Sequence, residues 1–322
     1  MPDVISFEEA IKATDGASRT LLIGNGFSAQ YFNYANLLAE SGLEPGTPLR
    51  DLFTGLDTVD FEKVVHALEN AVIVERAYKH VARVVELTKH AQEVREALVR
   101  AVHATHPAHR EDLAFQYDSS AAFLGHFETV FSLNYDLLLY WVNLEKRLRS
   151  DGFGLGDYAG SFIGPFREDA NCSLFNLHGG LHLFDKGSDE ILKAIDGGNG
   201  VIATIADTIV KKQRLPIYVA EGTSAQKMQK IWSVAYLRHC YGKLKDNASV
   251  TFVYGHSADE NDAHIYRAIF ESGVKQLYFG VFQPNNDKLR FLDGQLAKYQ
   301  KIWGADTRYS FYASESAKVW DA

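Results

Sequence analysis

The residue types that could do chemistry gather directly after apolar runs of the chain. Five short motifs occupy such places: Gly24-Asn25-Gly26-Phe27-Ser28, Asn134-Tyr135-Asp136, His178-Gly179, Gly222-Thr223-Ser224 and Gly255-His256-Ser257. A neutral amide such as asparagine can fix hydroxyl groups. A histidine that titrates near neutrality can take a proton from a hydroxyl or from water. The motifs therefore offer proton transfer and the binding of hydroxyl-bearing or phosphate-bearing ligands.

The first motif has the pattern of a turn that holds a phosphate. The apolar run at residues 20–23 predicts a buried strand, Gly24 and Gly26 allow close approach of the backbone, and a helix is expected at residues 28–38. Ala29 stands where the last small residue of a dinucleotide-binding fingerprint would stand. The same glycines could serve the geometry of the turn alone. A redox coenzyme site would need an acidic residue after a second strand, and no strand precedes the nearby glutamates.

Apolar runs alternate with helical patterns along most of the chain. This predicts a Rossmann-like α/β fold, a doubly wound and mostly parallel sheet with helices on both faces. The carboxyl ends of parallel strands share one edge of such a sheet, which is the binding crevice, so the five motifs should converge there. Further strands are expected at residues 127–133, 173–177, 215–220, 249–254, 275–282 and 308–313, and helices at 137–147, 224–243, 261–271 and 287–302.

The chain of 322 residues is expected to form a single domain with two insertions. Apolar residues recur at helical spacing from residue 61 to about residue 103, which predicts a helical insertion at about 55–120. Glycines and aromatic residues crowd residues 151–165, which predicts a loop-rich insertion at about 150–172, and residues 187–200 are expected to be irregular. Ser6 and Glu9 form a capping-box pattern that predicts a short helix near the start of the chain.

The composition argues against several classes of function. A net charge of −8 without a dense stripe of lysine and arginine disfavours direct binding of nucleic acid. Two cysteines, Cys172 and Cys240, cannot build a disulfide framework or a zinc ribbon. We expect a cytoplasmic protein, because no signal peptide or membrane-spanning apolar window is visible. No metal is expected, since His103, His106 and His109 are interpreted as a solvated loop.

The order of the five motifs resembles the sirtuin fold family, most closely the bacterial sirtuin-like branches of anti-phage defence proteins that consume NAD. The resemblance covers about residues 21–282, in short motifs. It implies that Asn134 contacts the nicotinamide-side ribose and the attacking water, and that His178 is the base. It implies that the glycine turn and the Gly-Thr-Ser loop hold the phosphates and the adenosine ribose. The expected ligand-binding residues are Gly24, Asn25, Gly26, Phe27, Ser28, Asp136, Gly222, Thr223, Ser224, Gly255, His256 and Ser257.

The resemblance implies that NAD is a substrate, which is cut into nicotinamide and ADP-ribose. Cleavage of this bond passes through an oxocarbenium-like state, and nicotinamide leaves readily, so no strong acid is needed. Protein-deacylating sirtuins carry a four-cysteine zinc module, which two cysteines cannot make. They also carry a Gly-Ile-Pro-Asp-Phe-Arg segment, where residues 29–33 here read Ala-Gln-Tyr-Phe-Asn. Deacylation is therefore not expected.

Each candidate residue also has a purely structural interpretation. Asn134 could be a turn residue that tolerates a left-handed backbone, and His178 could be a buried histidine beside a glycine turn. Asp136 could cap the next helix, and His256 could pack at a strand end. The acidic residues at 259–262 are expected to cap and charge the start of a helix.

Three functions stay open on these grounds. The first is an NAD hydrolase of anti-phage defence. The second is a non-catalytic module that binds NAD or ADP-ribose, and the third is an assembly subunit for a partner such as an operon-encoded ATPase. A free NAD hydrolase would harm its host, so we expect control by a homo-oligomer or a partner protein, with the helical insertion as the contact surface.

Overall fold

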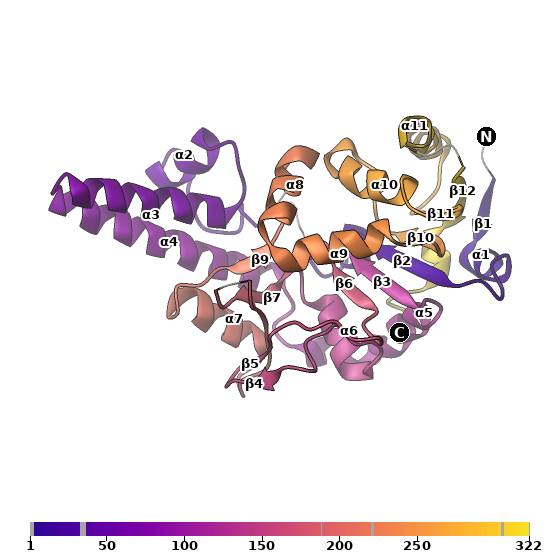
Figure 1. Ribbon diagram of the computed structural model, residues 1–322, viewed down its shortest axis with the longest axis horizontal. Helices are drawn as coiled ribbons and strands as arrows, with labels where there is room; N and C mark the ends of the chain where they lie inside the picture. Colours follow the sequence, from indigo (N-terminus) through magenta and orange to yellow (C-terminus); the bar gives the residue numbers. More distant parts are fainter. Residues whose placement is uncertain (1–2, 33–36, 188, 220–221, 304–305, 322) are drawn as a thin grey trace.

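The computed structural model describes residues 3–32, 37–187, 189–219, 222–303 and 306–321. Within them, a parallel sheet of seven strands forms the centre of the molecule (Figure 1). The first strand lies at one edge. From the second strand, at the middle of this sheet, the chain adds strands to one side, then returns and adds strands to the other, as doubly wound nucleotide-binding sheets do. This confirms the predicted Rossmann-like fold. From edge to edge the strands are β1 (Val4–Ser6), β12 (Arg308–Ala313), β11 (Gln276–Val281), β10 (Val250–Tyr254), β2 (Arg19–Ile23), β3 (Thr129–Ser132) and β6 (Leu174–Asn176).

Helices cover both faces of the parallel sheet. Successive side chains of a strand point to opposite faces, so Leu21 and Ile23 of β2 enter one core and Leu22 enters the other. All three are fully buried, which is why this strand appears in the sequence as an unbroken apolar run. The first core lies under α1 (Phe7–Lys12), α5 (Tyr117–Gly125) and α6 (Leu138–Lys146), the second under α9 (Ala235–Lys245), α10 (Ala263–Phe270) and α11 (Asn286–Trp303).

A helical hairpin projects from one end of the sheet, at the left of Figure 1. It consists of α3 (Phe61–Ala77) and α4 (Val81–Thr105), and α2 (Pro48–Gly55) lies next to its base. The base is buried through residues such as Val65 and Val94, which pack into the first core. Within the described ranges, no helix is long and apolar enough to cross a membrane.

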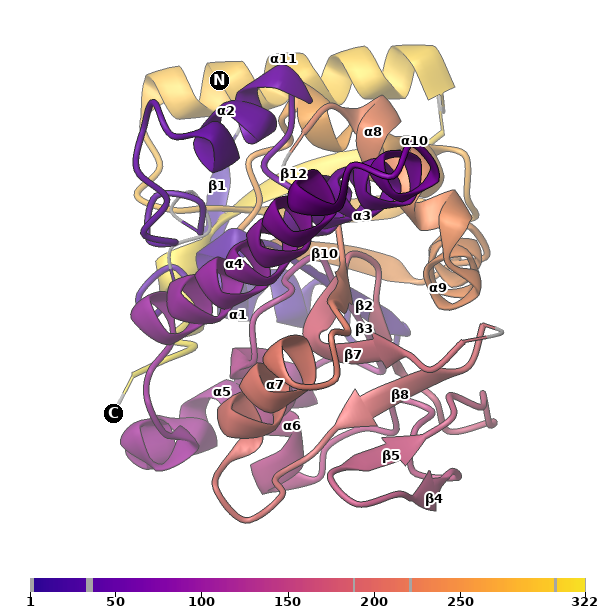
Figure 2. The ribbon, with the colours of Figure 1, turned by 90° about the vertical axis from the view of Figure 1, so that its left-hand side faces the viewer.

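A second sheet of five strands corrects three sequence predictions (Figure 2). The expected loops at 151–165 and 187–200 contain strands, and the strand expected at 215–220 pairs antiparallel with β7 instead of joining the parallel sheet; residue 220 lies outside the described residues. Short apolar runs do not reveal which sheet they join, because periodicity is the same in both. The strand order is β4 (Asp157–Tyr158), β5 (Phe162–Gly164), β8 (Ile191–Ala194), β7 (Gly179–Asp185) and β9 (Pro216–Tyr218), with α7 (Val201–Val210) packed on β7 and β8.

Two predicted helices differ from the structure. After β2 the chain forms a 3-10 turn, η1 (Asn25–Phe27), and residues 28–31 form further turns, while residues 33–36 of the expected helix lie outside the described part. The buried Phe32 packs on His106 and Tyr135, and this packing replaces a regular helix. The helix expected at 224–243 is divided into α8 (Ser224–Ser233) and α9 by the extended backbone of Val234. Three further 3-10 turns are η3 (Arg110–Gln116), η4 (Glu260–Asp262) and η5 (Ser314–Ala317).

The start of the chain forms the predicted capped helix. The Ser6 hydroxyl accepts the Glu9 N–H at 3.2 Å, and the Glu9 carboxylate accepts the Ser6 N–H at 2.8 Å. These two bonds are the reciprocal pair of a capping box at the beginning of α1. Strand β1, which precedes this helix and pairs parallel with β12, was not predicted.

Candidate functional site

A cavity of about 400 Å³ lies at the carboxyl ends of the central strands. It is placed where the strand order reverses, between β2 and β10, and ligands of doubly wound sheets bind at this point. Four of the five sequence motifs contribute to its wall. The lining residues are Asn25, Leu133, Tyr135, His178, Val219, Lys227, Gly255, His256, Ser257, Asp259, Asn261 and Asp262.

The glycines of the first and last motifs pack against each other. Gly24 N–H donates to the last carbonyl of β10 at 2.9 Å, and Gly26 N–H donates to Gly255 O at 2.7 Å. A Cβ on Gly26 would lie 2.5 Å from Gly255 Cα, and a Cβ on Gly255, whose φ is +71°, would lie 2.6 Å from Phe27 N. The N–H groups of both glycines are therefore bonded within the protein. These glycines let two loops touch, and Asn25 between them lines the cavity.

The first two motifs meet at Ser28. The Asn134 side-chain amide donates to Ser28 Oγ at 3.0 Å, and Ser28 also hydrogen-bonds the Asp136 carboxyl. Asp136 accepts the Leu138 N–H at 2.7 Å and so caps the first turn of α6. Burial raises the pKa of Asp136 to about 6, against the effect of these hydrogen bonds.

Asn134 carries an orphaned oxygen. Its Oδ1 is buried, and nothing in the described part of the chain hydrogen-bonds to it. A buried polar atom of this kind normally has a water or a ligand as its partner. Asn134 itself is absent from the cavity wall, whereas its neighbours Leu133 and Tyr135 form part of it.

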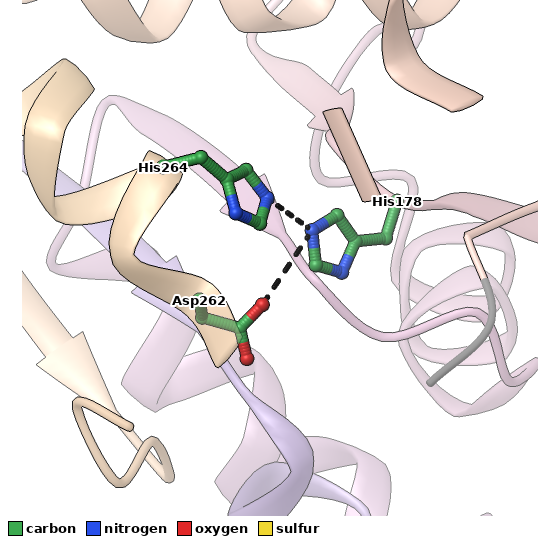
Figure 3. A group of neighbouring side chains, drawn as sticks. All are labelled: His178, Asp262 and His264. Carbon is green, nitrogen blue, oxygen red and sulfur yellow. Dashed lines mark hydrogen bonds and ion pairs between the residues drawn. The ribbon is translucent and has the colours of Figure 1, made fainter. Parts of the chain in front are cut away.

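His178 is the centre of a polar network, and Figure 3 shows it with its neighbours Asp262 and His264. Its Nε2 lies 3.2 Å from His264 Nε2 and 3.9 Å from Asp262 Oδ1. Asp262 ends the turn η4 and His264 lies in the first turn of α10, so both follow β10. His264 Nδ1 lies 3.1 Å from Ser224 Oγ, which also accepts the His264 backbone N–H at 3.1 Å. We call these residues, together with Lys227 and His256, the His178 network.

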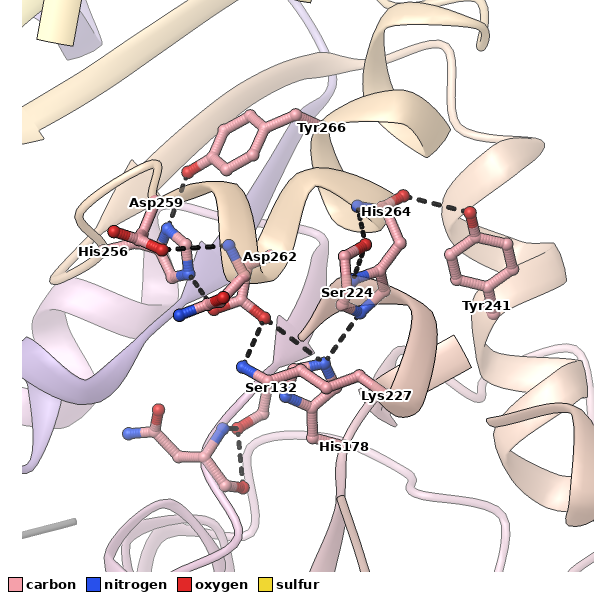
Figure 4. A network of polar contacts seen from close by, with 12 residues as sticks. Ser132, His178, Ser224, Lys227, Tyr241, His256, Asp259, Asp262, His264 and Tyr266 are labelled. Carbon is pink, nitrogen blue, oxygen red and sulfur yellow. Dashed lines mark hydrogen bonds and ion pairs between the residues drawn. The ribbon is translucent and has the colours of Figure 1, made fainter. Parts of the chain in front are cut away.

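Asp262 is held as a carboxylate by three partners (Figure 4). Lys227 Nζ lies 2.9 Å from its Oδ1, and His256 Nε2 lies 3.3 Å from its Oδ2. His256 Nδ1 in turn lies 2.7 Å from the Tyr266 hydroxyl. Burial opposes ionisation of Asp262, but the hydrogen bond from His256 and the charge of the Lys227 ammonium hold its pKa well below the usual range.

Both histidines at the centre of the network are neutral at pH 7. Burial lowers the pKa of His178, although the Asp262 carboxylate opposes this effect, and burial lowers the pKa of His264 to about 4. The ligand atoms of His178, Asp262 and His264 lie within 4.8 Å of one another, a spacing that a transition metal could bridge. The Lys227 ammonium already forms an ion pair with Asp262 Oδ1, so a positive charge is present at this oxygen. We therefore interpret the cluster as a proton-carrying network.

The remaining predicted residues divide between two other places. Thr223 caps α8, because its hydroxyl accepts the Gln226 N–H at 3.3 Å, and with Gly222 it lines a second cavity of about 500 Å³. Phe27 is a core residue whose carbonyl accepts the Trp320 indole N–H at 2.5 Å. A third cavity of about 460 Å³ lies between α3 and α8. The three cavities are neighbours, because each pair has wall residues in common. The first and third cavities share Val219 and Lys227, the first and second share Asn261, and the second and third share Thr58 and Gln226.

Sequence reasoning missed Lys227, Asp262 and His264. Asp259 caps η4 as predicted, since its Oδ1 accepts the Asn261 N–H at 2.9 Å, but Asp262 faces the histidines instead of capping a helix. The available signal was an aspartate and a histidine two residues apart, at a helix start just after a motif of the predicted crevice. Lys227 follows Ser224 by three residues in one helix, which places both on the same side of α8.

His106 corrects another prediction. It is buried, not part of a solvated loop, and its ring packs on Phe32 and Trp141 at 4.6 and 5.8 Å. Its Nε2 accepts the Leu137 N–H at 3.3 Å, and burial lowers its pKa to about 3. It is thus a core histidine. Cys240 is also fully buried.

Comparison with known protein families gives one match. A family model described as a domain of unknown function (DUF4917) matches residues 21–320, which include the parallel sheet except β1, the second sheet and the hairpin. No curated protein matches the chain.

Proposed function

The chain belongs to the DUF4917 family, and we propose that it is an NAD hydrolase that cleaves the bond between nicotinamide and ribose. The observation that carries the proposal is a neutral histidine, His178, in a cavity at the switch point of a Rossmann-like sheet. Dinucleotides bind at this point of such sheets. The motif order that resembles sirtuin-like defence proteins supports a role in bacterial anti-phage defence, through depletion of NAD in the cytoplasm.

In the proposed reaction, water attacks the anomeric carbon of the nicotinamide-side ribose. The carbon–nitrogen bond breaks and both of its electrons leave with nicotinamide, while the proton of water passes to the neutral imidazole of His178. The orphaned Oδ1 of Asn134 is suited to accept a hydrogen bond from a ribose hydroxyl or from the attacking water. Nicotinamide leaves as a neutral molecule, so the site needs no general acid. The products are nicotinamide, ADP-ribose and one proton.

The three neighbouring cavities offer room for an extended dinucleotide. Their volumes of about 400, 460 and 500 Å³ each lie in the range of small-molecule sites. The cavity of about 400 Å³ is lined by His178, and the cavity of about 500 Å³ is lined by Gly222 and Thr223. This division supports a chemical end at His178 and an adenosine end near the Gly-Thr-Ser loop.

The test compares turnover and binding in matched variants. The purified chain is incubated with NAD, nicotinamide is followed by chromatography, and NAD binding is measured by calorimetry. We expect His178→Ala to lower turnover at least 100-fold, since general-base catalysis contributes about 10²–10⁴-fold, and to retain NAD binding. His103→Ala, which alters an exposed histidine of α4, should match the wild type.

Two results would contradict the proposal. A wild-type chain that neither binds nor cleaves NAD would exclude any NAD function. Binding of NAD or ADP-ribose without turnover, unchanged by His178→Ala, would identify the alternative, a non-catalytic sensor or an assembly subunit of a defence complex with a partner ATPase.

A further inference from the structure

We propose that Asp262 and His264 are positioning residues that hold His178 in one tautomer, with its proton on Nε2 and the lone pair of Nδ1 left for the cavity. The inference rests on the proposed function, because it states how the base of that reaction is prepared. It uses contacts from η4, α8 and α10 that the NAD proposal does not need.

The Asp262 carboxylate decides which nitrogen of His178 carries the proton. A carboxylate can only accept hydrogen bonds, and its Oδ1 lies 3.9 Å from His178 Nε2. An N–H at this position points its positive end toward the negative oxygen, whereas a lone pair there would face a like charge. The carboxylate cannot easily rotate away, because Lys227 holds Oδ1 and His256 holds Oδ2.

His264 completes the same pattern. Its Nε2 lies 3.2 Å from His178 Nε2, so one of the two nitrogens must donate and the other accept. If His178 donates, His264 accepts at Nε2 and carries its own proton on Nδ1, which lies 3.1 Å from Ser224 Oγ. The two lone pairs of Ser224 Oγ can then accept both this N–H and the His264 backbone N–H. The His178 Nε2–H, the His264 Nδ1–H and the His264 backbone N–H then each have an acceptor.

The remaining nitrogen of His178 is the one available to a ligand. His178 lines the cavity, and within the described ranges no protein group hydrogen-bonds to its Nδ1. When Nδ1 takes a proton, the new imidazolium lies beside the Asp262 carboxylate, which stabilises it. The charged or titratable groups that face His178 are Asp262, His264, Lys227 and His256.

The tautomer can be read directly from histidine nitrogen shifts. We would label the full chain with [¹⁵N]histidine, assign the His178 signals with the His178→Ala variant, and record long-range proton–nitrogen correlations. The wild type should show His178 protonated at Nε2. In Asp262→Asn the negative charge beside Nε2 is lost, so the Nδ1–H form should gain population. His178 protonated at Nδ1 in the wild type, or a tautomer unchanged by Asp262→Asn, would overturn the proposal.

Kinetics supply a second readout. Asp262→Asn should lower kcat at least 10-fold, change KM less than about 3-fold, and move the acidic limb of the pH profile to lower pH, because the imidazolium loses its stabilising charge. His264→Gln keeps an acceptor near the Nε2 position and should retain most activity, whereas His264→Ala should lose it. Asp287→Asn, an exposed carboxylate on α11, is the matched control. An unmoved acidic limb in Asp262→Asn, or equal loss in both His264 variants, would contradict positioning.

The two experiments fail separately. A wild-type chain without NAD turnover would remove the proposed function, while the nitrogen shifts would still decide whether Asp262 and His264 set the tautomer of His178.

Discussion

Four titratable side chains at or near the cavity, His178, His264, Asp262 and Asp136, differ in charge although each is largely buried. His178 and His264 are kept neutral, because burial disfavours the charged imidazolium. Asp262 stays ionised, because Lys227 and two histidines surround it. At Asp136 the effect of burial dominates, so its pKa rises to about 6. The site therefore combines a neutral base, a fixed anion and a carboxyl that titrates near neutrality.

The raised pKa of Asp136 predicts how stability changes with pH. Its folded value of about 6 exceeds the ordinary 3.8, so the unfolded chain releases the proton first. As pH rises from about 4 to about 6, this group should lower the free energy of unfolding by up to about 3 kcal/mol. Asp136→Asn keeps an acceptor for the Leu138 N–H and removes the titration.

Urea denaturation at pH 4.5 and 7 checks this prediction. The stability of Asp136→Asn relative to the wild type should rise between the two pH values, by an amount on the order of 2 kcal/mol. The exposed variant Asp306→Asn should follow the wild type. An equal difference at both pH values would show that Asp136 is already ionised at pH 4.5.

At the level of elements, the sequence predicted the sheet better than its surroundings. The apolar run of β2 is buried on both faces, and such runs specify a central parallel strand. The contact between Ser28 and Asn134 followed from the rule that parallel strands end at one edge. The second sheet did not follow, because the strand after His178 begins at once at Gly179, without a crossover helix. Nothing local in the sequence marks that change of sheet.

The two glycine turns illustrate the same limit for the site. Gly24 and Gly26 fitted a phosphate-binding pattern, yet their partner is the turn after β10, more than two hundred residues away. The sequence could not show this contact, because it exists only once β2 and β10 are neighbours in the sheet. Lys227, Asp262 and His264 were missed for the same reason, since only the fold brings α8 and α10 to His178.

Close packing of these turns predicts a large cost for a single methyl group. Gly255→Ala would place a Cβ 2.6 Å from Phe27 N and would also occupy a positive φ of +71°. Gly16→Ala is the matched control, because its φ is +75° and nothing lies within 4 Å of its Cβ. Both variants bear the left-handed backbone cost of about 1–2 kcal/mol. The clash should lower the free energy of unfolding of Gly255→Ala by about 1–3 kcal/mol more. Chemical denaturation measures the free energy of unfolding of both variants, and an equal decrease in the two would show that the turns can separate freely.

On the scale of the whole molecule, the outer half of the helical hairpin has no core to contact. The buried residues of α3 end at Leu68, and those of α4 begin at Ala91. Between them lies an apolar surface, the hairpin tip: Ile73, Val74, Tyr78, Val81 and Val85, each more than half exposed. Charges of both signs surround it: Glu75, Arg76, Lys79, Arg83 and Glu86. A patch that carries both signs can be complementary to itself, which a symmetric dimer requires.

We therefore expect two copies of the chain to associate through the hairpin tip. Size-exclusion chromatography with light scattering should give a mass above that of one 36.0 kDa chain, rising with concentration. Val81→Glu combined with Val85→Glu places charge in the apolar patch and should return the measured mass to that of one chain. The free energy of unfolding should change by less than about 1 kcal/mol, because both side chains are exposed. Phe291→Glu, which alters an exposed aromatic ring on α11, should leave association intact. A strictly monomeric wild type, or a double variant with unchanged mass, would place any control of the proposed hydrolase elsewhere.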